Sequence, residues 1–367
     1  MQIPDWQNWN HDEPGIADLE SRLEELSRLD AQADEQGGWS ELLWQAVVAA
    51  GATRWVPGQE YGGLGLQTAA TLARFARLAE SSLTAAFLLS QQDAAVRRLA
   101  PSAGRSPQIA SLLRDVAAGS SFITVGISQL TTSTRLGQAP MQAHATDDGG
   151  LILNGAMPWV TGATQASAFV TGGVIEDGRQ VLVLAPRDRP GICVAPPLPL
   201  AALQASCTCE VRCEQVRIEP EEILAGPSHE VMKIPGLAGT GGLETSALAL
   251  GQARAALKAL AGITTHEGQE HEPTTALAAT WKEIADDLLL AACQHPDAPP
   301  APAIRQRANG LVNRTAQAYL TARKGSGFLR TEPAQRWARQ ALFFLVWSCP
   351  TPVAQASMRD MAGLCPL

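Results

Sequence analysis

The sequence predicts an α+β fold, in which a central antiparallel β domain lies between two helical domains. The first observation is that both ends of the chain have helical patterns rich in Ala, Leu and Arg. The second is that the middle of the chain is rich in Val, Thr, Ile and turn residues, which is typical of strands. The 367 residues therefore divide into an N-terminal helical domain over 1–120, a β-barrel or sandwich domain over 121–230, and a C-terminal four-helix bundle over 231–367.

The first domain is expected to contain five helices. Apolar residues repeat every three or four positions from Ile16 to Leu29, which predicts an amphipathic helix over 16–30. The other four are expected over 39–50, 67–80, 82–99 and 107–118.

Turn residues divide the central domain into strands. Asp148-Gly149 and Asp177-Gly178 stand at hairpin positions, and Leu153 begins the second strand of the first hairpin. Further strands are expected over 122–128, 168–174, 180–186 and 206–218.

A Gly-rich hinge over 235–242 precedes the last domain. Helices are expected after it at about 243–264, 274–293, 303–323 and 332–347, with a Pro-rich loop over 294–302.

Composition excludes several classes of protein. A net charge of −8 and a pI near 5.3 predict no basic surface for nucleic acid. No apolar run reaches the roughly 18 residues that a membrane helix needs. The acidic N-terminal region does not resemble a secretory signal, and seven cysteines is an odd number. Reduced thiols in a cytoplasmic protein are therefore expected.

The strand that begins near Leu153 ends in Trp159-Val-Thr161. Alternation along a strand predicts that Trp159 and Thr161 share a face. An indole beside a hydroxyl suits a planar heteroaromatic ligand, although a strand Trp more often belongs to a core.

Two motifs connect this strand with a known family. They are Pro57-x-x-Glu60-Tyr61-Gly62-Gly63-x-Gly65 and Leu153-Asn-Gly-x-x-x-Trp159-x-Thr161, and looser matches occur over 125–134, 248–257, 325–328 and 333–339. In this order the stretches resemble the acyl-CoA dehydrogenase family of FAD enzymes, from about residue 40 to about residue 350. The helix–sheet–helix order of the chain agrees with the three-part order of that family.

The resemblance implies FAD as cofactor. The four residues expected to bind it are Ser128, Thr134, Trp159 and Thr161. Trp159 and Thr161 would lie against the isoalloxazine, and Ser128 takes the place of a Thr that bonds its pyrimidine side. Ser133 and Thr134 replace a Gly-Ser pair near the pyrophosphate or the acyl-CoA. The Arg and Phe-Gly that usually reach a neighbouring subunit's FAD are absent, which puts the contact with the adenine end in doubt.

The catalytic base departs from the family pattern. The family removes the α-proton of an acyl thioester with a Glu, and the matching position here is Ser348. Some members place the base on the helix after the hinge, at a position that aligns with Gly241. Glu244 lies about one helical turn later and is the candidate base. The alternative is an acidic residue that only favours the helix N-terminus.

No metal site is expected. His266 and His271 are five residues apart, which does not match the spacing of the zinc-protease motif. Cys207, Cys209 and Cys213 fall on one face of a strand and are expected to be buried apolar residues.

The leading expectation is a divergent FAD-dependent oxidoreductase of acyl thioesters. One alternative is a catalytically silent subunit of a heteromeric enzyme, and the other is a flavin monooxygenase or oxidase on the same fold. An electron-acceptor flavoprotein is an expected partner of the dehydrogenase. Residues 341–347 are apolar on all sides, which predicts a homo- or hetero-oligomer.

Overall fold

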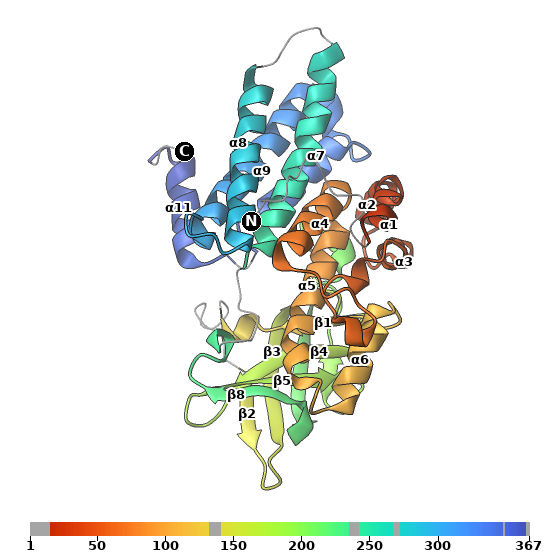
Figure 1. Ribbon diagram of the computed structural model, residues 1–367, viewed down its shortest axis with the longest axis vertical. Coiled ribbons are helices and arrows are strands. Elements are labelled where there is room, and N and C mark those ends of the chain that lie inside the picture. The colour runs from red at the N-terminus through yellow and green to blue at the C-terminus, as the bar shows by residue number, and fades with distance from the viewer. Residues whose placement is uncertain (1–14, 132–140, 235–241, 267–271, 348, 365–367) are drawn as a thin grey trace.

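The computed structural model describes residues 15–131, 141–234, 242–347 except 267–271, and 349–364. Most helices from both ends of the chain gather at one end of an elongated molecule, and the sheet occupies the other, with one N-terminal helix beside it (Figure 1). The N-terminal helices are α1 (Ile16–Glu20), α2 (Leu23–Gln36), α3 (Glu41–Ala49), α4 (Thr68–Ser81), α5 (Leu83–Leu99) and α6 (Pro107–Ala117). These confirm the five helices expected from the sequence, with the first one divided into α1 and α2.

Serine side chains begin three of these helices. The hydroxyls of Ser40, Ser82 and Ser106 accept hydrogen bonds from backbone amides in the first turns of α3, α5 and α6. These bonds satisfy amides that have no partner within the helix.

The sheet contains eight strands within the described residues. They are β1 (Ile123–Gly126), β2 (Gln142–Ala145), β3 (Leu151–Val160), β4 (Ala168–Val174), β5 (Gln180–Pro186), β6 (Ile192–Val194), β7 (Cys209–Ile218) and β8 (Ile223–Ser228). The order is β6-β7-β3-β2-β4-β5-β8, and β1 pairs with β4.

The prediction of an antiparallel sheet was wrong in one respect, because the sheet is mixed. β1 pairs with β4 in parallel, and β2 meets β4 in parallel through Gln142 and Val174. Side chains alternate in the same way along both kinds of strand, so the sequence pattern could not separate them. β1 is fully buried, and α5 packs against it, as is usual for parallel strands.

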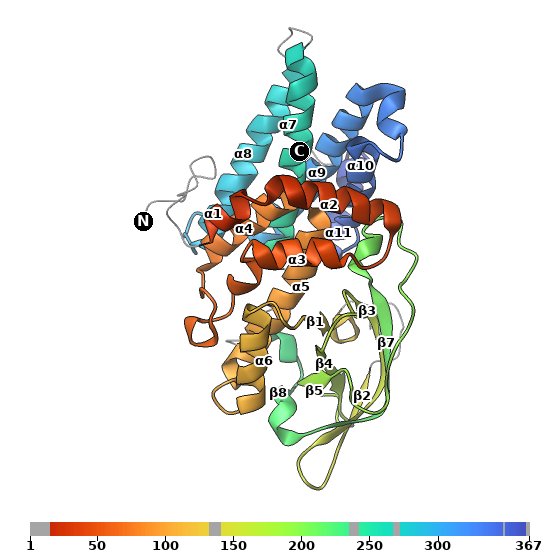
Figure 2. The ribbon, with the colours of Figure 1, turned by 90° about the vertical axis from the view of Figure 1, so that its right-hand side faces the viewer.

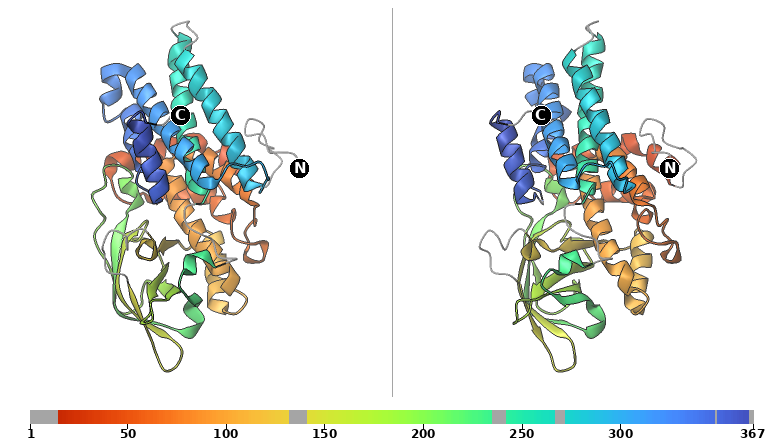
Figure 3. Two further views of the ribbon diagram at one scale, coloured as in Figure 1. Left: turned by 90° about the vertical axis from the view of Figure 1, so that its left-hand side faces the viewer. Right: turned by 60° about the vertical axis from the view of Figure 1, so that its left-hand side comes forward.

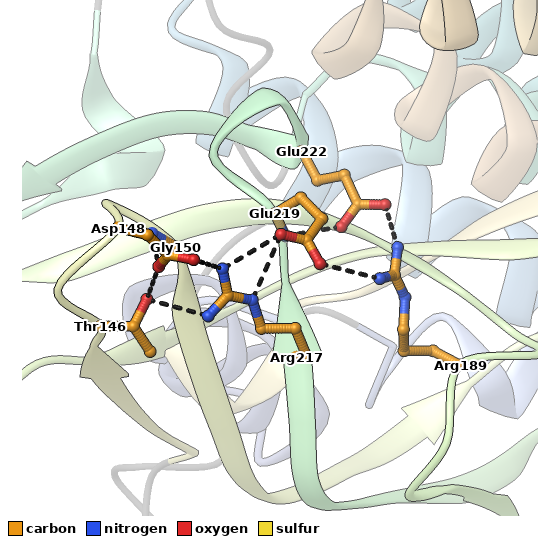
Figure 4. Close-up of polar contacts among 7 residues, drawn as sticks. All are labelled: Thr146, Asp148, Gly150, Arg189, Arg217, Glu219 and Glu222. Atoms are coloured by element: carbon orange, nitrogen blue, oxygen red, sulfur yellow. Dashed lines mark hydrogen bonds and ion pairs between the residues drawn. The ribbon is translucent and has the colours of Figure 1, made fainter.

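A network of charged residues ties the β2–β3 hairpin to β7 (Figure 4). Arg217 donates to Asp148 in the hairpin turn and to Thr146 (3.1 Å), and it also pairs with Glu219 (3.1 Å). The hydrogen bond from Arg217 holds the pKa of Asp148 well below its usual range. This network lies on the surface, and it holds the turn between β2 and β3 against the end of β7.

The C-terminal helices are α7 (Glu244–His266), α8 (Glu272–Ala292), α9 (Ala301–Arg323), α10 (Pro333–Phe343) and α11 (Thr351–Met361). The four expected helices are present, but α10 ends four residues earlier than predicted. The structure adds α11, which the sequence reading did not include. α11 packs against α9, and Figure 3 shows both at the edge of the helical part.

The N-terminal and C-terminal helices pack directly together, with α4 against α7. A side chain at Gly251 of α7 would place its Cβ 2.1 Å from the carbonyl oxygen of Ala76 in α4, so only glycine permits this approach. α5 lies between the helices and the sheet, and most of its residues are buried (Figure 2). No helix of the described residues has the length and apolar character needed to cross a membrane.

Candidate active site

β3 brings two of the expected cofactor residues to its end, with different exposure. Trp159 is 52% exposed, whereas Thr161 is 4% exposed and its hydroxyl lies 3.4 Å from that of Thr208. The strand ends at Val160, after a shift in its pairing with β7. The alternation that predicted a shared face for Trp159 and Thr161 therefore does not extend to Thr161.

Ser128 lies close to the end of β3. It begins a 3-10 turn (Ser128–Leu130) just after β1, and this turn packs against β3. A Cβ at Gly126 would lie 2.5 Å from the sulfur of Met157, so the ends of β1 and β3 are in close contact. The Ser128 hydroxyl is buried and has no hydrogen-bond partner within the part of the chain that the structure describes. Thr134 and Ser133 lie outside the described residues.

Glu244, the candidate base, is the first residue of α7 and is partly buried. Its charge acts on two residues of α5, Asp93 and Arg98, because α5 and α7 pack together. The structure therefore places Glu244 at the crossing of these two helices. The position that the family gives to the other base, Ser348, lies outside the described residues.

Asp93 is a site residue that the sequence reading missed. It is 2% exposed, and neither carboxylate oxygen has a hydrogen-bond partner among the described residues. Burial raises its pKa to about 8, against the positive charge of Arg97 and with a smaller contribution from Glu244. The neighbouring Gln92 is also buried, and neither end of its amide has a partner. No clear signal for its burial was available in the sequence, because Asp93 follows Ser90, Gln91 and Gln92, a polar run that an exposed helix face would also carry.

Arg98 adds a positive charge at the same place. Burial lowers its pKa to about 10, and the charge of Glu244 opposes this change. Its guanidinium donates to the backbone oxygen of Ala94 (2.6 Å). Asp93, Arg97, Arg98 and Glu244 are named here the α5–α7 cluster.

Two arginines from the Pro333-x-x-Arg336-x-x-Arg339 match have structural partners. Arg336 pairs with Asp30 (3.5 Å) and Arg339 with Asp34 (2.5 Å), both on α2. These ion pairs attach α10 to α2, although the two helices lie far apart in the sequence.

Side chains of α9 hold the last turn of α10 and the segment after it. Asn313 donates to the carbonyl of Ala341 (3.1 Å), Asn309 to that of Phe344 (2.8 Å), and Arg305 to that of Trp347. Because the donors are spaced one turn apart, they follow the chain up to the position before Ser348. The acceptors are backbone oxygens, so the contact does not depend on which side chains the segment carries.

The three cysteines considered for a metal site are buried in the β domain. Burial raises the pKa of Cys209 to about 11 and that of Cys213 to about 12, and Cys207 is also buried. Among the residues that the structure describes, no three His, Cys, Asp or Glu side chains are placed to hold a metal ion. His271 lies outside these residues.

Comparison with known proteins places this geometry in context. No family model matches the chain. A probable acyl-CoA dehydrogenase, YngJ of Bacillus subtilis, is 23% identical over 65% of this chain and 67% of its own length. The butyryl-CoA dehydrogenase of Megasphaera elsdenii has the same fold, with a TM-score of 0.78, 17% identity and coverage of 97% of this chain and 100% of that one.

Proteins of other function share the fold. KijD3 in complex with FMN and a dTDP-linked amino sugar gives a TM-score of 0.77 at 16% identity, over 98% of this chain and 96% of that one. The dibenzothiophene monooxygenase of Paenibacillus sp. A11-2 gives 0.73 at 18% identity, over 96% and 97%. The chain therefore has the acyl-CoA dehydrogenase fold, and its sequence is similar to that of a probable acyl-CoA dehydrogenase.

Proposed function

We propose that this protein is an FAD-dependent oxidoreductase that acts on acyl thioesters. The observation that carries the proposal is the buried Ser128 hydroxyl, which no described residue satisfies, in a turn that packs against β3, the strand that carries the exposed ring of Trp159. This arrangement occurs on a fold that is shared with an acyl-CoA dehydrogenase and with an FMN-binding protein.

The residues present fit the isoalloxazine end of a flavin. A buried hydroxyl without a partner costs free energy, and a hydrogen bond to the pyrimidine side of the ring would remove that cost. An indole that is half exposed offers a flat surface for the ring system. The Thr161 hydroxyl has only a long contact with Thr208, so it retains capacity for another hydrogen bond.

The bound FAD would supply the acceptor for a hydride from the β-carbon. The chain itself would supply the base, and Glu244 is the proposed group that takes the α-proton. A partly buried carboxylate at the α5–α7 crossing suits this role, because carboxylates serve as general bases in proton transfer.

The absorbance spectrum of the purified protein tests the cofactor, and anaerobic bleaching by a panel of acyl-CoAs tests the reaction. We expect a flavin spectrum, with or without added FAD, and bleaching by at least one acyl-CoA. Protein that neither carries nor takes up FAD would favour the silent-subunit alternative. Bleaching that persists unchanged in Glu244→Gln would remove Glu244 from the mechanism.

A flavin monooxygenase or oxidase is the second candidate. The observation that favours it is the loss of the family Glu at Ser348, since a flavin that reacts with oxygen does not need that base. The shared fold of the dibenzothiophene monooxygenase supports this candidate. Retained flavin that no acyl-CoA bleaches, together with oxygen consumption after chemical reduction, would decide for it.

For the dehydrogenase, we propose an electron-transferring flavoprotein as acceptor and an oligomeric state above the monomer. One structure of the same fold comes from work on the electron transferring flavoprotein of Acidaminococcus fermentans (TM-score 0.79, 18% identity). Exposed apolar side chains occur in the C-terminal helical region, at Phe328, Leu329, Leu342 and Val346.

A further inference from the structure

The end of α10 and the segment after it carry two aromatic rings that pack on α5. The rings of Phe343 and Trp347 stack, with centroids 5.2 Å apart and planes at 14° to each other. Phe87 of α5 meets both of them edge-on, at 4.9 Å and 4.8 Å. Phe87 is 3% exposed, whereas Phe343 and Trp347 are only partly buried. The stacked pair therefore has a firm backing in α5 and keeps some ring surface exposed.

A second aromatic cluster in the same protein shows the arrangement of core rings. Trp44 and Phe122 meet edge-to-face at 4.9 Å, and each is 5% exposed. Core packing leaves almost no surface on these two rings. The stacked pair differs, because aromatic surface that stays in contact with water is costly until a ligand or a partner covers it.

Printed contacts place the stacked pair beside the end of β3. Leu88 follows Phe87 on α5, and a Cβ at Gly162, the residue after Thr161, would lie 3.4 Å from the Leu88 side chain. A second route leads from α10 itself, where Arg339 donates to the carbonyl of Ala201 (3.1 Å) in the loop before β7.

That loop returns to the same strand end. It contains a 3-10 turn (Gln204–Ser206), which packs on α5, and the amide of Gly162 donates to the carbonyl of Ser206 (2.7 Å). Both routes therefore connect the stacked pair with the residues that follow Trp159, where the proposed function locates the flavin ring.

The backbone that carries the pair is held without help from its own side chains. Asn309 donates to the carbonyl of Phe344 (2.8 Å), and Arg305 donates to the carbonyl of Trp347 itself. A wall that is fixed before the ligand arrives loses little freedom on binding, which favours affinity for a ligand of matching shape.

We propose that Phe343 and Trp347 form the wall that selects the acyl group, and that the substrate is the thioester of an aromatic acid. This inference rests on the proposed function. A planar ring can stack on the pair or meet it edge-on, and a flexible alkyl chain gains no such contact. The alkyl chain also loses more conformational freedom when it is bound. Trp347 is thus a specificity residue, because an indole has no group that exchanges a proton with the substrate at neutral pH.

The first experiment compares two thioesters whose acyl groups have the same number of carbon atoms, dihydrocinnamoyl-CoA and nonanoyl-CoA. Isothermal titration calorimetry of the purified protein with added FAD measures both affinities. We expect dihydrocinnamoyl-CoA to bind more tightly, and Trp347→Leu to weaken its binding by roughly three- to tenfold. The affinity for nonanoyl-CoA should change by less than about twofold, because leucine preserves apolar contact. Trp347→Phe keeps a ring and should retain most of the preference.

Trp337→Leu is the matched control. Trp337 lies on the same helix, is partly buried and packs on Tyr319 at 5.4 Å, so its loss also removes an aromatic contact. Both affinities should remain unchanged in this variant. Phe343→Leu removes the other ring of the pair and should change the preference in the same direction as Trp347→Leu, which keeps the test decisive if Trp347→Leu does not fold.

Three results would overturn the proposal. The first is equal affinity of the wild type for the two thioesters, and the second is an equal loss for both of them in Trp347→Leu. The third is a smaller oligomer of Trp347→Leu by light scattering with an unchanged preference, since a second copy of the chain would then be what covers the rings.

Anaerobic bleaching of the flavin by the same two thioesters separates this inference from the proposed function. Faster bleaching by dihydrocinnamoyl-CoA, slowed in Trp347→Leu, is the expected result. Equally fast bleaching by nonanoyl-CoA would overturn the aromatic wall and leave the proposed function intact. Selective binding of dihydrocinnamoyl-CoA without bleaching by any thioester would leave the wall intact and overturn the dehydrogenase function.

Discussion

Ser128 and Asp93 share one property, which is a buried polar group that no described residue satisfies. Native proteins satisfy most such groups, and those left over gather where a ligand or a reaction will use them. The two residues differ in how the sequence presents them. Ser128 was found through its place in a family motif, whereas Asp93 is buried only because α5, α7 and β1 meet there. A contact between segments that lie far apart along the chain leaves no local pattern to read.

Ser128→Ala should separate cofactor binding from stability. Removal of an unpartnered buried hydroxyl should leave the flavin-free protein equally stable or more stable, by up to about 1 kcal/mol. The same change should weaken FAD binding by roughly tenfold, equivalent to about 1.4 kcal/mol. Denaturant unfolding and fluorescence titration with FAD measure the two effects. Equal FAD affinity in the two proteins would remove Ser128 from the flavin site.

Trp159→Ala is expected to lower FAD occupancy clearly, because the half-exposed indole would lose its contact with the ring system. The flavin-to-protein absorbance ratio after gel filtration measures it. Leu42→Ala is the matched control, since Leu42 is exposed on α3 (68%) and belongs to no expected site. Unchanged occupancy in Trp159→Ala would place the ring of the flavin elsewhere.

Local sequence patterns predicted the helices and strands better than they predicted the residues of the candidate site. β4 and β5 have the expected ends, since alternating or continuous apolar runs bounded by turns determine a strand locally. The parallel pairing of β1 could not be predicted in the same way, because it depends on where the chain enters the sheet after α6. The extra helix α11 packs on α9, and its short sequence has only one buried residue, Val353.

The contact of α7 with α4 gives a prediction at this scale. Gly251→Ala should destabilise the protein by about 1–3 kcal/mol, because the new Cβ would overlap the Ala76 carbonyl oxygen unless the helices separate. Gly262→Ala lies on the same helix with nothing near its Cβ, so it should stabilise by about 0.8–1 kcal/mol through helix propensity alone. Denaturant unfolding of the two variants compares them directly. A gain in stability for both would show that the helices do not depend on the glycine contact.

Most of the helices lie at one end of the molecule and the sheet lies at the other, with α6 beside the sheet and α5 running between the two parts (Figure 2). Both proposed groups of the site belong to this junction, with Ser128 following β1 and Asp93 on α5. The order of helices and strands along the chain predicted the architecture. It did not predict which side chains would meet where α5 joins the two parts.

Association in solution is the prediction for the whole molecule. Leu342 (53% exposed) and Val346 (73%) lie at the end of α10 and just after it, where apolar surface is costly in water. We expect at least a dimer by light scattering at micromolar concentration, and Leu342→Glu with Val346→Glu should shift it toward the monomer. Leu42→Glu, on α3, is the matched control and should leave the mass unchanged. A monomeric wild type would contradict the prediction.

The row of donors on α9 has a consequence for how this chain could diverge. Arg305, Asn309 and Asn313 donate hydrogen bonds to main-chain oxygens in the last turn of α10 and in the segment after it. The path of the backbone as far as Trp347 therefore depends on side chains of one helix. The side chains of that segment can be exchanged without loss of these hydrogen bonds. During evolution, a serine could replace a glutamate at position 348 without loss of these hydrogen bonds. The same fold could then host one reaction in one descendant and another in the next.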